Sequence, residues 1–213
     1  MKALFTAIRN REIENIQRLI EKKPELINCV AKAPPKKDDG LSPLQVAFKT
    51  FNIWAVRFFI EHGADVNYMD QSEVNTWNMP VLHDAVMAIV ALARFEYPID
   101  PWDKIKKSQM EIRGKKENFD AVLMLLEIMI EKGADVNSQD SKGNTVLHRA
   151  CLDVENRRFD QHQLSVATLE DVRQLFQLLI KYGADLNQAT TTRESVIKLF
   201  PNLFEELDLK IRE

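Results

Sequence analysis

The stretch Gly133-Ala134-Asp135-Val136-Asn137 is followed, after a short gap, by Gly143-Asn144-Thr145-Val146-Leu147-His148-Arg149-Ala150. The first of these segments recurs as Gly63-Ala64-Asp65-Val66-Asn67 and as Gly183-Ala184-Asp185-Leu186-Asn187, so the chain contains an internal repeat. Apolar residues stand three, four and seven positions before each glycine, which is the spacing of one helix face. We therefore expect each copy to end a helix, since glycine readily adopts the left-handed conformation that follows a last helical turn.

The second segment also recurs, as Ser42-Pro43-Leu44-Gln45-Val46-Ala47 and as Pro80-Val81-Leu82-His83-Asp84-Ala85. These segments resemble the Thr-Pro-Leu-His-x-Ala signature that opens the first helix of an ankyrin repeat. The chain is thus similar to the ankyrin repeat family in three recognisable repeats and two degenerate capping repeats. The resemblance implies an all-α solenoid of about five helix-turn-helix units, each preceded by a finger loop.

The spacing of the repeats is irregular. Gly63, Gly133 and Gly183 lie 70 and 50 residues apart, whereas ankyrin repeats recur roughly every 33 residues. The excess falls between the helices of the third and fourth repeats and in one finger, where added length is tolerated. We predict a single domain over residues 1–213. Its repeats are expected at 1–28 (a cap), 29–67, 68–137 with an insertion at 96–118, 138–187 with an insertion at 153–169, and 188–213 (a cap).

The two insertions are expected to lie side by side, because the repeats that carry them are neighbours. In the third repeat, the apolar pattern predicts a first helix from Val81 to Phe95 and a second from Phe119 to Glu131. We expect the inserted residues to pack together as a small subdomain opposite the fingers. The basic residues between Lys104 and Lys116 are interpreted as a solvated helix face, with contact to an acidic partner as the alternative.

Composition and charge narrow the function classes. A hydrophobic content of 45% predicts a folded chain, and a net charge of −3 makes nucleic acid an unfavourable partner. Cys29 and Cys151 form no metal or redox motif and are interpreted as incidental thiols of a reducing compartment. The apolar runs are too short for a signal peptide or a membrane span. We therefore expect a monomeric, cytoplasmic protein without membrane contact.

The repeat motif residues are expected to act structurally. In the ankyrin family, the motif histidine bonds to backbone between repeats and pairs with the motif threonine. Here only Thr145 with His148 is complete, because Pro80 lacks a hydroxyl group for His83 and Gln45 replaces the first histidine. Aspartates on separate repeats do not converge as an acid and base pair must. The residues given this structural role are Gly63, Asp65, Asn67, His83, Gly133, Asp135, Asn137, Thr145, His148, Gly183, Asp185 and Asn187. No catalytic residue, cofactor site or metal site is expected, so we predict that the chain is not an enzyme.

The finger before the third repeat carries unusual side chains for a loop, namely Tyr68, Met69, Trp77 and Met79. They could cover the base of their own finger. They could equally form a partner-binding patch, because aromatic residues and methionine are enriched at protein interfaces. We hypothesise that these four residues bind a partner.

The family resemblance implies a non-enzymatic protein–protein interaction module, such as a scaffold, adaptor or inhibitor. Its concave surface of fingers and first helices would bind a protein. One alternative is a bacterial ankyrin protein that acts as a toxin inhibitor or as an effector exported into a host cytosol. Another is a binder of acidic or nucleic-acid surfaces through the basic insertion 104–116, whose affinity would fall steeply with salt.

Overall fold

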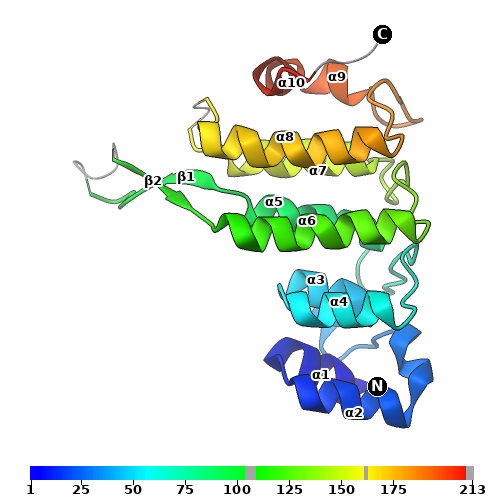
Figure 1. The fold of residues 1–213 in the computed structure, drawn as a ribbon. Helices are drawn as coiled ribbons and strands as arrows, with labels where there is room; N and C mark the ends of the chain where they lie inside the picture. Colours follow the sequence, from blue (N-terminus) through cyan, green and yellow to red (C-terminus); the bar gives the residue numbers. More distant parts are fainter. Residues whose placement is uncertain (104–108, 161–162, 210–213) are drawn as a thin grey trace.

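The chain folds into consecutive pairs of helices. The computed structural model describes residues 1–103, 109–160 and 163–209. In these residues the pairs are α1 (Lys2–Asn10) with α2 (Ile13–Lys22), α3 (Pro43–Lys49) with α4 (Ile53–Glu61), α5 (Val81–Leu92) with α6 (Lys116–Glu131), α7 (Val146–Arg157) with α8 (Val166–Lys181), and α9 (Val196–Leu199) with α10 (Pro201–Leu207). Two 3-10 turns, η1 (Pro24–Asn28) and η2 (Lys36–Asp38), lie between α2 and α3. The pairs are stacked in chain order, with the connecting fingers on one side (Figure 1).

Local sequence signals set the ends of several helices. Ser42 begins α3 with a reciprocal cap, in which its hydroxyl accepts from the Gln45 backbone amide (3.2 Å) and the Gln45 side chain accepts from the Ser42 amide (3.1 Å). At the far end of α6, Gly133 adopts a φ of +94°. Residues with a side chain seldom adopt this value, so glycine allows the chain to leave the helix and start the next finger.

A continuous apolar core joins the pairs. The motif leucines Leu44, Leu82 and Leu147, one on each of three successive first helices, are at most 1% exposed. Each repeat can bury such a residue only against its neighbours, so burial of apolar surface is what holds the stack together. Among the described residues, no helix combines the length and the apolarity that a membrane crossing requires.

The insertion of the third repeat forms a β-hairpin. Strands β1 (Phe95–Pro98) and β2 (Met110–Arg113) pair antiparallel, with Phe95 opposite Arg113 and Pro98 opposite Met110. The hairpin projects from the stack on the side opposite the fingers (Figure 1). The expected solvated helix face is therefore wrong for residues 110–113, which form a strand, and residues 104–108 of that expectation lie outside the described part of the chain.

The expected helix from Val81 to Phe95 is too long, because α5 ends at Leu92. The backbone amide of Arg94 donates to Oδ2 of Asp171 on α8 (2.9 Å), and its guanidinium group binds both oxygens of the same carboxylate. This contact lies where the chain leaves α5 and runs toward β1. The sequence pattern around Arg94 contained no sign of it, because Asp171 is far away in the chain.

The insertion of the fourth repeat mainly lengthens helices. Of residues 153–169, the first five continue α7 to Arg157 and the last four begin α8 at Val166. The two insertions lie side by side, as the Thr168 hydroxyl donates to the Arg94 carbonyl (2.7 Å) and Phe95 and Leu164 line one small hollow. Instead of the expected separate subdomain, the root of the hairpin packs directly against the start of α8.

Candidate functional site

The four finger residues proposed to bind a partner differ in how far they are exposed to solvent. Tyr68 is half-buried and donates its hydroxyl to the Gly40 carbonyl of the preceding finger (2.7 Å). Met69 and Met79 are also half-buried near the base of their finger, where Met69 forms a β-bridge with Pro80. Trp77 is the most exposed of the four, at 36%. The structure therefore does not present them as one apolar patch.

Trp77 connects its finger to the next one. Its indole Nε1–H donates to Oδ2 of Asp140 (2.8 Å), and the Arg149 guanidinium group lies 5.9 Å from the centre of its ring. Burial alone would raise the pKa of Asp140, but hydrogen bonds from Asn144, Trp77 and Lys142 outweigh it and lower the pKa. Trp77 is thus held in place by a charged carboxylate and a cation, while about a third of its surface faces solvent.

A row of charged residues continues from Trp77 along the first helices. Arg149 on α7 pairs with Asp153 (3.0 Å), and Lys49 on α3 pairs with Asp84 on α5 (2.7 Å). Burial raises the pKa of Asp84, although Lys49 and a hydrogen bond from Gln45 oppose that rise. Lys49, Asp84 and Asp153 also line a hollow of 170 Å³ on this face. We did not predict these residues from the sequence, although Asp84 and Arg149 directly follow the motif histidines.

The motif residues form hydrogen bonds between repeats. The Nδ1 atom of His148 accepts from the Thr145 backbone amide (3.2 Å) and lies 2.8 Å from the Thr145 hydroxyl. Its Nε2–H therefore donates to the Glu194 carbonyl of the following repeat (2.7 Å). Both ring nitrogens of His148 are thus used in hydrogen bonds that cap α7 and join it to the following repeat.

Asparagines at the ends of the repeats form a second set of contacts. Asn67 accepts from the Asp135 backbone amide (2.9 Å) and donates to the Gly133 carbonyl (2.8 Å). Asn28 makes the same two contacts to Asp65 and Gly63, and Asn137 makes them to Asp185 and Gly183. The carboxylates of Asp65, Asp135 and Asp185 each accept from the backbone amide two residues further on. These polar groups therefore tie one repeat to the next.

A family model described as ankyrin repeats (many copies) matches residues 111–153. This range includes both motif segments of the fourth repeat boundary, residues 133–137 and 143–150. A Fowlpox virus (strain NVSL) protein named as an ankyrin repeat protein is 28% identical over 186 residues. The chain is thus similar to the ankyrin repeat family in both comparisons. The match covers 75% of this chain and 31% of the viral protein, so the chain spans about a third of that relative's length. Ankyrin repeat proteins generally act as non-enzymatic interaction modules.

His83 shows how this chain departs from the ankyrin signature. Its Nε2 atom bonds to the Ser138 carbonyl (3.1 Å), as the equivalent contact of His148 does, but its Nδ1 atom is buried without a hydrogen-bond partner among the described residues. Pro80 stands where the signature has threonine, and it offers neither a hydroxyl group nor an N–H. Burial also lowers the pKa of His83 to about 4, so the ring is neutral at physiological pH.

Replacing Pro80 by threonine should stabilise the fold by about 0.5–1.5 kcal/mol, because the new hydroxyl group would cap α5 and supply a donor for Nδ1 of His83. The measurement is the free energy of unfolding in denaturant. Pro80→Val is the matched control, since valine has the shape of threonine without its hydroxyl group. Equal stabilities for the threonine and valine variants would contradict this account of His83.

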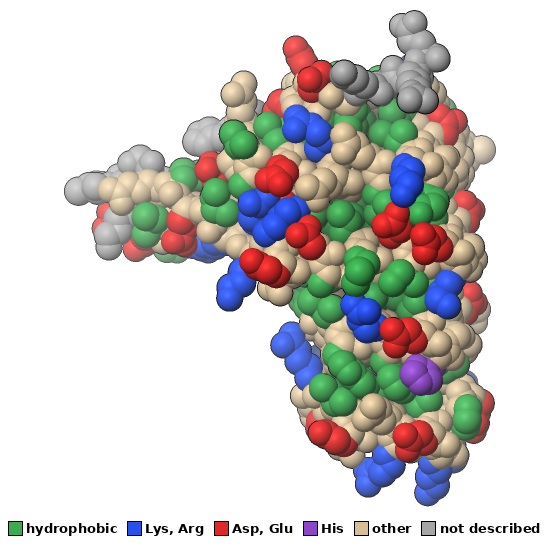
Figure 2. All heavy atoms as spheres, viewed as in Figure 1, with side chains coloured by type: hydrophobic (Ala, Val, Ile, Leu, Met, Phe, Trp, Pro, Cys, Tyr) green, Lys and Arg blue, Asp and Glu red, His purple; other side chains and the backbone are tan. Residues whose placement is uncertain are grey.

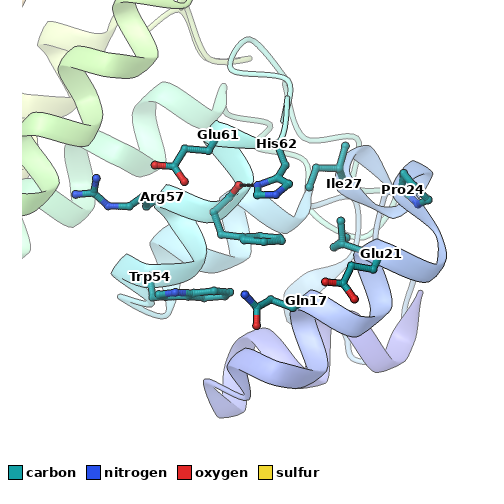
Figure 3. A pocket seen from close by; sticks show the side chains of 10 residues that line it. Gln17, Glu21, Pro24, Ile27, Trp54, Arg57, Glu61 and His62 are labelled. Atoms are coloured by element: carbon teal, nitrogen blue, oxygen red, sulfur yellow. Dashed lines mark hydrogen bonds between the residues drawn. The ribbon is translucent and has the colours of Figure 1, made fainter.

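A larger groove lies between α2 and α4, which are the second helices of the first two pairs (Figure 3). Its volume is 510 Å³. Trp54, Phe58 and His62 stack along α4 with ring centres 5.0 and 4.0 Å apart, and His62 Nδ1 donates to the Phe58 carbonyl (2.7 Å). Apolar side chains gather over the helices α2 and α4 on the face seen in Figure 2. The charged residues that line the groove, Glu21, Arg57 and Glu61, are of both signs.

Proposed function

We propose that this chain is a non-enzymatic protein-interaction module that binds a protein partner through its fingers and first helices. In this proposal the five helix pairs form one ankyrin solenoid of five units over residues 1–213, divided into the repeats predicted from the sequence. The module acts as a monomer in the cytoplasm, or in a host cytosol if it is exported. Scaffold, adaptor, inhibitor and effector roles are all compatible with it, since each requires only the binding surface.

The observation that carries the proposal is the position of Trp77. Tryptophan and arginine dominate the binding energy of many protein interfaces, and here Trp77 lies over Arg149 with part of its surface exposed. The contacts of Trp77 to Asp140 and Arg149 already restrict its side chain, so binding would lose little conformational freedom. Tyr68, Met69 and Met79 belong to the proposed surface as supports of this finger.

The alternative that relies on the basic insertion 104–116 has less support. Of its three described cations, Arg113 pairs with Glu111 (2.9 Å), and Lys116 pairs with Asp120 and Asp171 (2.8 and 3.2 Å), which leaves Lys115 as the one without an ion pair among the described residues. Charges that are paired within the chain attract an acidic partner only weakly.

Trp77→Ala should weaken partner binding by about 2 kcal/mol or more, roughly thirtyfold in affinity. A partner is first recovered with the tagged chain from its native cell, and its affinity for purified variants is then measured by calorimetry. Trp102→Ala is the matched control, because Trp102 is 93% exposed and lies beyond β1, away from the fingers.

The fold should survive the loss of Trp77. Asp140 keeps hydrogen bonds from the Asn144 side chain and from the Lys142 and Asn144 amides, so no buried carboxylate is left without donors. We expect a stability loss of about 1 kcal/mol. If Trp102→Ala weakened the partner as much as Trp77→Ala did, or if neither variant changed affinity, the fingers would not be the binding surface.

A further inference from the structure

A small apolar pocket lies at the N-terminal end of the stack, between α1 and the first finger. Its volume is 230 Å³, smaller than a typical pocket for a drug-sized ligand and suited to one side chain. Phe5, Ala31, Pro34 and Pro35 form its apolar walls, while Lys2 and Lys32 stand at its rim. Both lysines are exposed.

The carboxylate in the pocket wall is already engaged. Asp38 is 2% exposed and forms a bidentate ion pair with Arg9, in which Nε of Arg9 lies 2.9 Å from Oδ2. The neighbouring Asp39 accepts from the Ala33 and Glu73 amides and from the Ser72 hydroxyl. Both acidic groups of this finger are therefore occupied by other partners.

The lysines around the pocket have no such partners. Within the described residues, none of Lys2, Lys32, Lys36 and Lys37 forms an ion pair. Residues 1–11 and 29–40 together contain six lysines and arginines against two aspartates, although the whole chain has a net charge of −3. The pocket is thus a locally positive site in a negatively charged protein, in contrast to the paired cations Arg113 and Lys116 of the hairpin region.

We propose that this pocket binds an acidic peptide segment of a protein partner, in which one apolar side chain enters the pocket and flanking carboxylates contact Lys2 and Lys32. Electrostatic complementarity selects the acidic segment and speeds its association, and burial of the apolar side chain against Phe5 and the prolines anchors it. The inference rests on the proposed function, since α1 and the first finger belong to the same series of first helices and fingers.

The test is a titration of the ¹⁵N-labelled full chain with the synthetic peptide acetyl-Asp-Asp-Leu-Asp-Asp-amide, followed by NMR chemical shifts. We expect changes at residues of α1 and the first finger, with a dissociation constant on the order of 0.1–1 mM. A peptide with glycine in place of leucine and one with asparagine in place of aspartate should each bind at least about fivefold more weakly. Raising the salt concentration should weaken the parent peptide as well.

Variants locate the site. Lys2→Glu with Lys32→Glu should lower affinity about tenfold or more, and Lys22→Glu with Lys23→Glu is the matched control, because these lysines are exposed in the same helix pair but do not line the pocket. Equal losses in both pairs, or absence of shifts near the pocket, would overturn the proposal. So would tighter binding of a single-stranded oligonucleotide, or a dimer in sedimentation that Lys32→Glu dissociates.

The peptide titration and the Trp77→Ala experiment test the two proposals separately. Peptide binding at the pocket is measured without the native partner, whereas the Trp77 experiment requires it. Loss of the peptide site with retention of the Trp77 effect would reject only this inference, and the opposite result would reject only the finger surface as the main contact.

Discussion

Asp171→Ala should lower the free energy of unfolding by about 2–4 kcal/mol, because it removes the buried anion that two half-buried cations share and leaves the Arg94 backbone amide without its acceptor. The Asp171 side chain is 0% exposed and accepts hydrogen bonds from the backbone amide and the guanidinium group of Arg94. It also forms an ion pair with Lys116. These contacts hold the end of α5 and the start of α6 against α8. Chemical denaturation of the purified variant gives the measurement.

Glu170→Gln is the matched control for Asp171. Glu170 binds the same guanidinium group at 2.8 Å but is 52% exposed, so we expect a change of less than about 1 kcal/mol. A large loss of stability in the Glu170 variant, or a small one in Asp171→Ala, would contradict the claim that the buried carboxylate contributes more to stability than the exposed one.

The contribution of Asp171 should also depend on pH. Burial by itself would raise the pKa of Asp171, but the hydrogen bonds from Arg94 and Lys116 outweigh it and hold the pKa below its ordinary value. A lowered pKa in the folded state means that the stabilisation is present above the pKa of the unfolded chain, about 4, and disappears as the pH falls through the folded value. The stability gap between the parent chain and Asp171→Asn should therefore be constant near neutrality and narrow below about pH 4.

Leu147→Ala should cost about 2–5 kcal/mol, because Leu147 is 1% exposed and its removal opens a cavity where α7 meets the neighbouring pairs. Thr145→Ala should cost only about 1 kcal/mol, through loss of the helix cap and of the hydrogen bond to His148. Thermal and denaturant unfolding of both variants provides the comparison.

Leu199→Ala is the matched control for Leu147, since Leu199 is a helical leucine that is 45% exposed. Its removal should change stability by less than about 0.5 kcal/mol. If Leu147→Ala were as harmless as Leu199→Ala, the motif leucines would not form the core between repeats.

Features with a local or periodic cause could be predicted from the sequence. The glycine that ends a helix, the capping threonine and the apolar residue three or four positions away act within one or two helical turns, so their spacing predicted the helices. The ankyrin family was indicated by the resemblance of the motif segments to its signature. The same local logic identified the complete Thr145–His148 pair and the missing hydroxyl group beside His83. Trp77 was selected for its residue type, and the structure adds that it is held between Asp140 and Arg149.

Features that join distant parts of the chain were decided only by the tertiary structure. Just after α5 ends, Arg94 binds Asp171, 77 residues later, and no pattern around Arg94 encodes that contact. The pairing of Lys49 with Asp84 and the pocket between Phe5 and Pro35 likewise arise because stacking brings separate repeats together. Periodicity determines which face of a helix is buried, whereas the energies of ion pairs and pockets depend on which side chains the folded stack places within a few ångströms of each other.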